Sequence, residues 1–198
     1  MANTPTPYEY EQTHDRKLLE SICVAAVAQV TSFDKKKMTV NLQPLSKHLV
    51  HGKYESQPQI LRVPVICFRS NGFIFRPFCK KGDIGIVLYL DHDMDSTVSG
   101  GKEAEPLTER THSTTDAIFI GGIVSGEYKL PDTLPDDAFI FTKEDGTLYI
   151  SVTKEKIALK NVETTAEFTA DAISMTAKTV NITATENLNL RGERININ

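Results

Sequence analysis

Apolar residues in the last quarter of the chain recur as pairs whose two members are separated by one position. Such residues point to the same side of a β-strand, so each pair predicts a short strand with one apolar face. The pairs are Ile150/Val152, Ile157/Leu159, Ala166/Phe168, Ile173/Met175, Val180/Ile182, Leu188/Leu190 and Ile195/Ile197. Successive pairs begin 7, 9, 7, 7, 8 and 7 residues apart. Because an odd step would turn the next pair to the opposite face, a turn, bulge or kink must redirect the chain between pairs.

A periodic run of short strands is typical of a solenoid or an intertwined fibre. A single-chain β-helix needs about 20 or more residues per coil, so residues 147–198 would form only two or three coils. Three chains wound about one axis would fill a narrow core that one chain cannot enclose. The alternative is an antiparallel sandwich, which should show Gly, Pro and Asx-Gly turn signals about every 8 to 12 residues. Beyond Pro135 the chain has no proline and only Gly146 and Gly192, so the pattern favours an intertwined triple-stranded β-helix, a homotrimer.

In this interpretation the inward apolar residues form the core that the three chains share. The predicted trimer core consists of Ile150, Val152, Ile157, Leu159, Phe168, Ile173, Met175, Val180, Ile182, Leu188, Leu190, Ile195 and Ile197. The outward positions carry mostly Thr, Lys, Glu and Asn, which suit exposed β structure and oppose sideways aggregation.

The N-terminal two thirds of the chain show a different pattern. Leu18, Leu19, Ile22 and Cys23 fall at i, i+1, i+4 and i+5, which predicts one short amphipathic helix that begins near Asp15. Apolar and β-branched runs that predict strands follow at residues 24–32, 38–42, 61–68, 80–90 and 117–124. Four or five strands with one short helix are typical of an OB-type barrel.

The sequence therefore predicts a mainly β protein with four parts. Residues 1–14 are polar and predict a flexible arm, and residues 15–130 form the OB-type barrel. Residues 131–146, with two prolines, form a linker, and residues 147–198 form the needle. Pro64 predicts an edge strand or a bulge within the barrel. The polar stretch 91–116 predicts a long exposed loop.

Composition and charge exclude several classes of function. The 198 residues are 40% hydrophobic and 24% charged, as in ordinary globular proteins. The net charge of −4 provides no basic footprint for a nucleic-acid backbone. No Gly-x-Ser-x-Gly motif is present, and barrel and needle leave no domain for paired-carboxylate chemistry, so we expect no enzyme and no cofactor. The three cysteines have no disulfide or zinc spacing, and no apolar run reaches the length of a membrane span.

Two local clusters are candidate binding sites. Asp91, Asp93 and Asp95 occupy positions 1, 3 and 5 of a calcium loop, but Ser96 and Lys102 stand where Gly and Glu are required, so a solvated loop without metal is favoured. A second cluster combines aromatic and basic residues as single-stranded nucleic-acid surfaces do. Its members are Phe68, Phe73, Phe75, Phe78, Tyr89, Arg62, Arg69, Arg76, Lys80 and Lys81. The negative net charge favours a protein-facing role for this cluster.

The runs GDIGIVLYLDHDMDS and RTHSTTDAIFIGGI resemble the N-terminal OB domain of the small baseplate central spike (baseplate assembly protein V-like) family of contractile-tailed phages. The residues that carry the resemblance are Gly82, Asp83, Asp91, Asp93, His112, Ser113, Asp116, Ala117 and Phe119. The resemblance implies a homotrimer in the tail baseplate of the virion, assembled in the host cytoplasm. Its barrels would plug the tail tube and contact hub or tube proteins, and its needle would pierce the host outer membrane on sheath contraction.

Some relatives in this family bind iron through a His-x-His motif at the needle tip. Here the last histidine is His112, so no iron site is carried over. The resemblance leaves open a hydrophobic plug at the tip or a separate PAAR-type tip protein. The alternatives to a spike are an OB-fold single-stranded nucleic-acid-binding protein and a receptor-binding tail fibre. Within the spike interpretation we expect no nucleic-acid partner.

Overall fold

The computed structural model describes residues 6–124, 126, 128–129 and 131–196. The chain divides into two compact units, Met1–Ser125 and Gly126–Asn198. The sequence interpretation placed this division a few residues later, at residues 130 and 131. No helix among the described residues is both long enough and apolar enough to cross a membrane.

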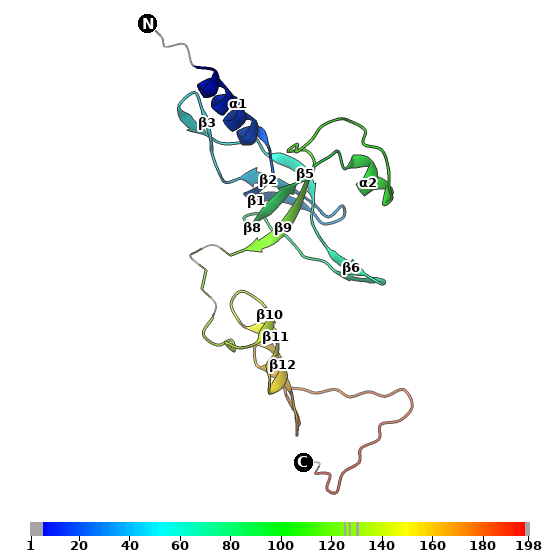
Figure 1. The fold of residues 1–198 in the computed structure, drawn as a ribbon. Coiled ribbons are helices and arrows are strands. Elements are labelled where there is room, and N and C mark those ends of the chain that lie inside the picture. Colours follow the sequence, from blue (N-terminus) through cyan, green and yellow to red (C-terminus); the bar gives the residue numbers. More distant parts are fainter. Residues whose placement is uncertain (1–5, 125, 127, 130, 197–198) are drawn as a thin grey trace. The chain divides into compact units, whose positions relative to one another are not determined.

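A curled five-stranded sheet forms the body of unit 1 (Figure 1). All neighbouring strands are antiparallel, in the order β5-β2-β1-β8-β9. The strands are β1 (Ala25–Asp34), β2 (Thr39–Pro44), β5 (Ile60–Pro64), β8 (Ile84–Tyr89) and β9 (Ala117–Ile123). The two edges meet just beyond β5, where Val65 forms a parallel bridge with Phe119 and the Ile66 N–H donates to the Phe119 carbonyl over 3.0 Å. The sheet thus forms a half-barrel. The predicted mainly β fold is confirmed, the five strands of this half-barrel agree with the predicted four or five, and Pro64 lies on an edge strand as predicted.

The concave side of the curled sheet holds the core of unit 1. In β2 the residues alternate between half-buried and buried, which places Val40 and Leu42 inside. Phe119 from β9 is fully buried against them in the same cluster. Because alternation is the pattern of a sheet with one solvated face, the sequence could indicate these positions directly.

Gly85 in β8 allows the Phe119 ring to approach the sheet. A Cβ at this position would lie 2.3 Å from the Ile120 carbonyl oxygen and 2.6 Å from the Phe119 ring. We expect Gly85→Ala to destabilise the barrel by about 2–3 kcal/mol, because rigid backbone and a core ring must move. Thermal unfolding of the full chain measures this. The matched control is Gly121→Ala, whose added methyl would make only an ordinary contact at 3.5 Å; an equal loss in both variants would contradict the explanation.

The N-terminal helix is longer than predicted. Helix α1 (Pro7–Ser21) includes much of the segment that was predicted as a flexible arm and ends before Ile22 and Cys23. A capping box explains the early start: the Thr6 N–H donates to Glu9 Oε2 over 2.8 Å, and the Glu9 N–H donates to Thr6 Oγ1. Pro7 at the first helical position also favours this start. The prediction of an arm over the first 14 residues was therefore wrong for its helical part.

The polar stretch 91–116 also contains more structure than a solvated loop. A second helix, α2 (Asp95–Gly100), lies within it and ends at Gly101, which has a left-handed backbone conformation. The prediction of a single helix was wrong in this respect. Asp93 and Met94, just before α2, are buried.

Two hairpins that the apolar pattern did not predict project from unit 1. The first joins β3 (His48–Val50) to β4 (Lys53–Glu55), and the second joins β6 (Phe68–Ser70) to β7 (Phe73–Phe75). Both have a two-residue turn that ends in Gly, and both turn residues have positive φ. Asn71-Gly72, in the second turn, is among the strongest hairpin signals in a sequence.

Unit 2 is an antiparallel meander of five strands. They are β10 (Phe139–Thr142), β11 (Leu148–Val152), β12 (Lys156–Asn161), β13 (Thr164–Thr169) and β14 (Ile173–Thr176), paired in this order. The antiparallel arrangement, which the sparse turn signals disfavoured, is therefore the one that a single chain adopts. A triple-stranded β-helix involves three chains and stays a prediction. Residues 177–196 contain neither strand nor helix, so the last three predicted strands do not form in one chain; Ile197 lies outside the described residues.

Candidate assembly surfaces

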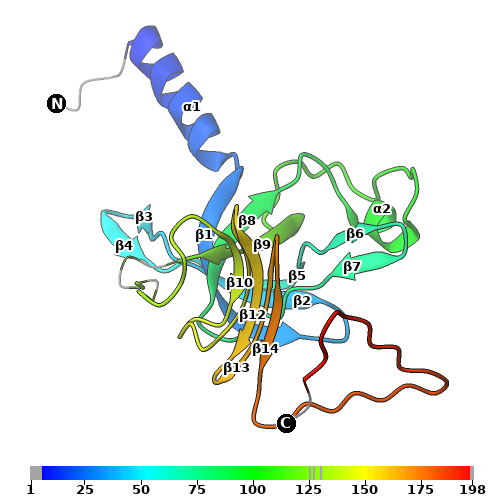
Figure 2. The same cartoon turned by 90° about the horizontal axis from the view of Figure 1, so that it is seen from below.

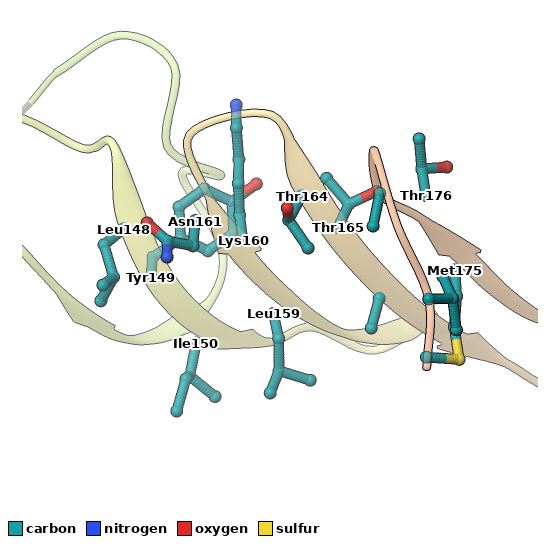
Figure 3. A pocket seen from close by; sticks show the side chains of 13 residues that line it. Leu148, Tyr149, Ile150, Leu159, Lys160, Asn161, Thr164, Thr165, Met175 and Thr176 are labelled. Atoms are coloured by element: carbon teal, nitrogen blue, oxygen red, sulfur yellow. The ribbon is translucent and has the colours of Figure 1, made fainter. Parts of the chain in front are cut away.

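The predicted apolar pairs of unit 2 gather on one face of the meander. In the strand register, Ile150 lies opposite Leu159, and Val152 lies opposite Ile157. The same face continues across β13 and β14 through the partners Ile157/Phe168, Leu159/Ala166, Phe168/Ile173 and Ala166/Met175. Figure 3 shows Ile150 and Leu159 pointing to one side of the sheet and Lys160 and Thr176 pointing to the other. The hairpin turns between strands thus redirect the chain as the odd spacing requires.

This apolar face is open to solvent along its whole length. Leu159 and Phe168 are each 40% exposed, and Ile173 at the edge strand is 69% exposed. Monomeric soluble proteins rarely expose a contiguous apolar patch of this kind, and such patches mark interaction surfaces. A hollow of about 260 Å³ extends over β11, β12 and β13 to Val180. The apolar residues that follow the meander, namely Val180, Ile182, Leu188, Leu190 and Ile195, are also exposed.

The opposite face of the meander carries charged side chains that interact with neighbours on the same face. Lys156 forms a salt bridge of 2.8 Å with Glu167, and the Lys160 ammonium lies 5.8 Å from the centre of the Tyr149 ring. Between these groups, Ser151 and Ala158 are buried. One face is therefore suited to water and the other to a partner.

Tight turns in unit 2 place one residue under strain. Val162, between β12 and β13, has a φ of 56°. This left-handed conformation is an outlier for a β-branched residue. The turn contains none of the Gly, Pro or Asx-Gly signals expected of an antiparallel sheet, so the sequence did not indicate this hairpin.

The residues of the sequence motif in unit 1 lie at two structural positions. Gly82 has a φ of 102° in the turn before β8, and the Asp83 carboxylate accepts the Lys80 N–H over 2.8 Å. Ala117 and Phe119 belong to the buried core of the barrel. These residues shape the barrel and expose no reactive group.

The remaining motif residues form hydrogen bonds that hold together the segment between β8 and β9. The His112 N–H donates to the Asp91 carbonyl over 3.3 Å, and the Asp116 N–H donates to the Ser113 carbonyl over 3.1 Å. The Ser113 hydroxyl bonds with the Thr115 hydroxyl at 2.8 Å. These contacts bring the two ends of the long segment together at the start of β9.

Asp116 forms the centre of a charged cluster next to α2. Its side chain is 1% exposed and bonds with Arg110 through Nε and Nη2 and with the Met94 N–H over 3.1 Å. The same guanidinium lies 3.0 Å from Asp93 and 2.9 Å from Asp95. Arg110 therefore ties both ends of the segment to the barrel.

The carboxylates that converge differ from those of the calcium pattern. Asp93, Asp95 and Asp116 each offer an oxygen within 4.8 Å of the others, whereas the Asp91 side chain is 80% exposed beside His112. The Arg110 guanidinium bonds to all three converging carboxylates, so a fixed positive charge occupies the place of a cation. The expectation of a solvated loop was wrong for Asp93, because its carboxylate accepts the Asp95 N–H and the Thr108 hydroxyl. Sequence reasoning missed Arg110, since no spacing links it to its partners.

This cluster predicts how stability depends on pH. Hydrogen bonds from Arg110 lower the pKa of Asp116, and the Asp95 N–H lowers the pKa of Asp93. A carboxyl with a lowered pKa in the folded state stabilises that state above its unfolded pKa of about 3.9. We therefore expect the melting temperature to fall as pH drops from about 4 downward. Asp116→Asn should make the melting temperature fall less steeply with decreasing pH in a series of thermal melts. An equally steep fall in this variant would contradict the assignment of the effect to Asp116.

The aromatic and basic cluster is centred on the β6–β7 hairpin. Phe68 and Phe75 are cross-strand neighbours with ring centres 6.3 Å apart, and Phe73 lies on the same face of the hairpin. Phe68 is 72% exposed and Phe73 is 80% exposed. Tyr89, which the sequence interpretation grouped with them, is buried in the barrel core, so that grouping was wrong for Tyr89.

The fold and these surfaces can be compared with known proteins. Residues 27–122 match the family model described as the phage protein Gp138 N-terminal domain. The match supports a phage structural protein. It covers the curled sheet, the hairpins and the Arg110 cluster, and it supports a virion-related function and a virion-associated location. A comparison of the chain with curated proteins gives no match.

Proposed function

We propose that this phage protein is the central spike of a contractile tail baseplate. Three copies would associate through the apolar faces of residues 139–196, and their barrels would plug the tail tube and contact hub or tube proteins. The observation that carries the proposal is the exposed apolar face of the meander, which lies in the same chain as a barrel that matches a phage protein domain. The protein would act mechanically, without catalysis or cofactor.

The apolar face of the meander is unfavourable while it stays open to water. Full burial of an exposed Ile, Leu, Val or Phe is worth about 1.5–3 kcal/mol, and the side chains of this face, which are 40–69% exposed, would each gain part of that. Three amphipathic sheets around one axis can bury their apolar faces together and leave their polar faces in water. A shaft built in this way resists fraying, because no chain can leave without exposing the core of the other two. Such a shaft can transmit the force of sheath contraction to a membrane.

Residues 177–196 extend the apolar pattern beyond the last strand. They repeat the spacing of the meander, yet they have no ladder partner in a single chain. Backbone groups of this exposed segment, which water can satisfy in a single chain, would form ladders when neighbouring copies supply strands. The tip of the needle would therefore order on assembly, with a PAAR-type protein or its own apolar residues closing the end.

The decisive experiment measures whether sheath contraction makes a membrane leak. Tails that carry the wild-type protein should release a dye from liposomes made of outer-membrane lipid when their sheaths contract. Tails with a spike truncated after residue 138 should contract without release. Tails that bind cells but release nothing on contraction would instead indicate a receptor-binding fibre.

A specific observation favours one alternative function, the binding of single-stranded nucleic acid. Exposed Phe68 and Phe73 provide rings for stacking, and Arg69 and Arg76, which are near them in the sequence, provide charges for phosphates. Binding of a labelled oligonucleotide that weakens steeply with salt, and that is lost in Phe73→Ala, would support this alternative against the spike. We expect no such binding, since the net charge of the chain is negative.

A further inference from the structure

Strand β8 has apolar residues on both of its faces, although only one face packs on the core of the barrel. Its sequence is Ile-Gly-Ile-Val-Leu-Tyr over Ile84–Tyr89. The buried residues of the concave side alternate with Ile84, Ile86 and Leu88, which lie on the convex side of the sheet. A strand with one face in water normally alternates apolar with polar residues, as β2 does. The convex face of β8 is therefore also suited to burial.

The two neighbouring strands extend this convex apolar face. β1, β8 and β9 lie side by side in the sheet (Figures 1 and 2). In their register Val27 lies opposite Ile86, and Ile86 lies opposite Ile120. These three side chains are between 38% and 43% exposed, so an apolar row across three strands is open to water. We call this row and the convex positions around it the outer patch; those positions are Ala25, Gln29, Ile84, Leu88, Ile118 and Ile123.

The outer patch carries no charge. Eight of its nine residues are aliphatic, and the ninth is Gln29. The convex side of β2, the next strand in the sheet, instead carries Thr39, Asn41 and Gln43. Permanent interfaces between identical subunits are more apolar than those with transient partners, which resemble the ordinary surface. The composition of the patch therefore favours further copies of this chain over a separate protein.

The connection between the two units favours the same occupant. β9 is the last strand of unit 1 and ends at Ile123, within the outer patch, whereas β10 begins at Phe139. Only residues 124–138, 15 in number, separate these strands. The proposed needle would therefore hold three outer patches within reach of one another. Such a tether raises their effective concentration to the millimolar range, so a contact too weak to join free barrels would form in the assembled trimer.

We propose that the outer patches of three copies pack against one another around the threefold axis. The barrels as well as the needle would then share an apolar core. Rotational symmetry brings copies of the same residues together near the axis. An uncharged patch tolerates this arrangement, whereas a patch with charges of one sign would repel its own copies. The inference rests on the proposed homotrimer and adds to it an interface formed by unit 1.

Thiol accessibility tests this contact in the full chain. Ile86→Cys and Ile120→Cys each place one thiol in the exposed row, at two independent positions. Thr39→Cys is the matched control, because Thr39 lies on the convex side of the same sheet but in its polar part. Alkylation by iodoacetamide is followed by peptide mass spectrometry, which separates each new thiol from the three native cysteines.

Each cysteine variant is compared in two states of assembly. One is the trimer, and the other is the same variant combined with Ile173→Asp and Val180→Asp, which should separate the needles. Sedimentation velocity identifies the trimeric and monomeric species. In the trimer the thiols at positions 86 and 120 should react at least about tenfold more slowly than in the monomer, because the reagent reaches them only when the barrels separate. The control thiol at position 39 should react equally fast in both.

Three outcomes would overturn the contact. Fast alkylation at positions 86 and 120 in an intact trimer would show that the barrels leave the patch open, and the homotrimer would stand. Equally slow alkylation in the monomer would show that the same chain covers the patch. A wild-type chain that sediments as a monomer would refute the homotrimer together with this contact.

Discussion

Replacing Ile173 and Val180 by Asp should convert the proposed trimer into monomers. Ile173 lies on the apolar face of β14, and Val180 lies just beyond it at the rim of the same hollow. In the proposed assembly each chain would place two carboxylates in the shared core, and each buried, unpaired charge costs several kcal/mol. We expect the wild-type trimer to resist SDS at room temperature and the double variant to migrate as a monomer. Sedimentation velocity without detergent should give the same result.

A control on the polar face makes this test specific to the apolar core. Ser174 and Thr176 alternate with Ile173 and Met175 along β14, so their side chains lie on the opposite face. Ser174→Asp with Thr176→Asp adds the same total charge, with both changes on β14, and should leave the proposed trimer intact. If the two double variants behaved alike, or if the core variant kept wild-type resistance, the core assignment would be wrong.

The N-terminal barrel was largely predictable because its signals are local. Strict alternation at Val40 and Leu42 indicated a half-buried strand, and the run after Gly82 indicated a turn that leads into an apolar strand. Each of these patterns follows from the two-residue period of a strand and needs no knowledge of neighbours. Their relation across the barrel, such as the bridge between Val65 and Phe119, has no local signal.

The structured segment between β8 and β9 could not be predicted in the same way. Arg110 bonds with Asp116, Asp95 and Asp93, which lie 6, 15 and 17 residues away along the chain. Polar residues of this kind look like a solvated loop until tertiary contacts bring them together. Here a buried carboxylate was predicted only as a residue of a family motif, and its cation was not predicted at all.

In the C-terminal unit, the sequence indicated β11 to β14 but not their neighbours, and it placed β10 (Phe139–Thr142) in the linker. The paired spacing correctly placed apolar side chains such as Ile157 and Phe168 on one face. Spacing alone does not state whether a strand pairs within its own chain or with another. A single chain satisfies its ladders through hairpins, at the expense of a strained conformation at Val162. The exposed apolar face that remains is the physical reason to expect further copies.

Arg110→Ala should cause the largest loss of stability in unit 1. The variant leaves Asp116 buried, with its carboxylate deprived of the guanidinium. Breaking a buried pair from one side costs about 3–5 kcal/mol, and the partly exposed guanidinium places this case near the lower end. A loss of about 3 kcal/mol should lower the melting temperature of the barrel by about 10 °C. Differential scanning calorimetry of the full chain measures the barrel transition.

Two companion variants separate the buried charge from the rest of the cluster. Asp95→Asn removes the outer contact of the same guanidinium, and because the Asp95 side chain is 64% exposed, it should cost less than about 1 kcal/mol. Asp116→Asn in the Arg110→Ala background removes the unpaired charge and should recover part of the loss.

In Arg110→Ala, the contribution of Asp116 to stability should change with pH in the opposite direction to that in the wild type. Without its cation, the buried Asp116 carboxyl prefers its neutral form, so its folded pKa lies above the unfolded value. A group with a raised folded pKa stabilises the fold below the unfolded pKa and loses that contribution as pH increases. The difference in unfolding free energy between wild type and Arg110→Ala should therefore be small below about pH 4 and largest near pH 7. A difference that stays constant between these limits would show that Arg110 stabilises the barrel by packing and not by neutralising Asp116.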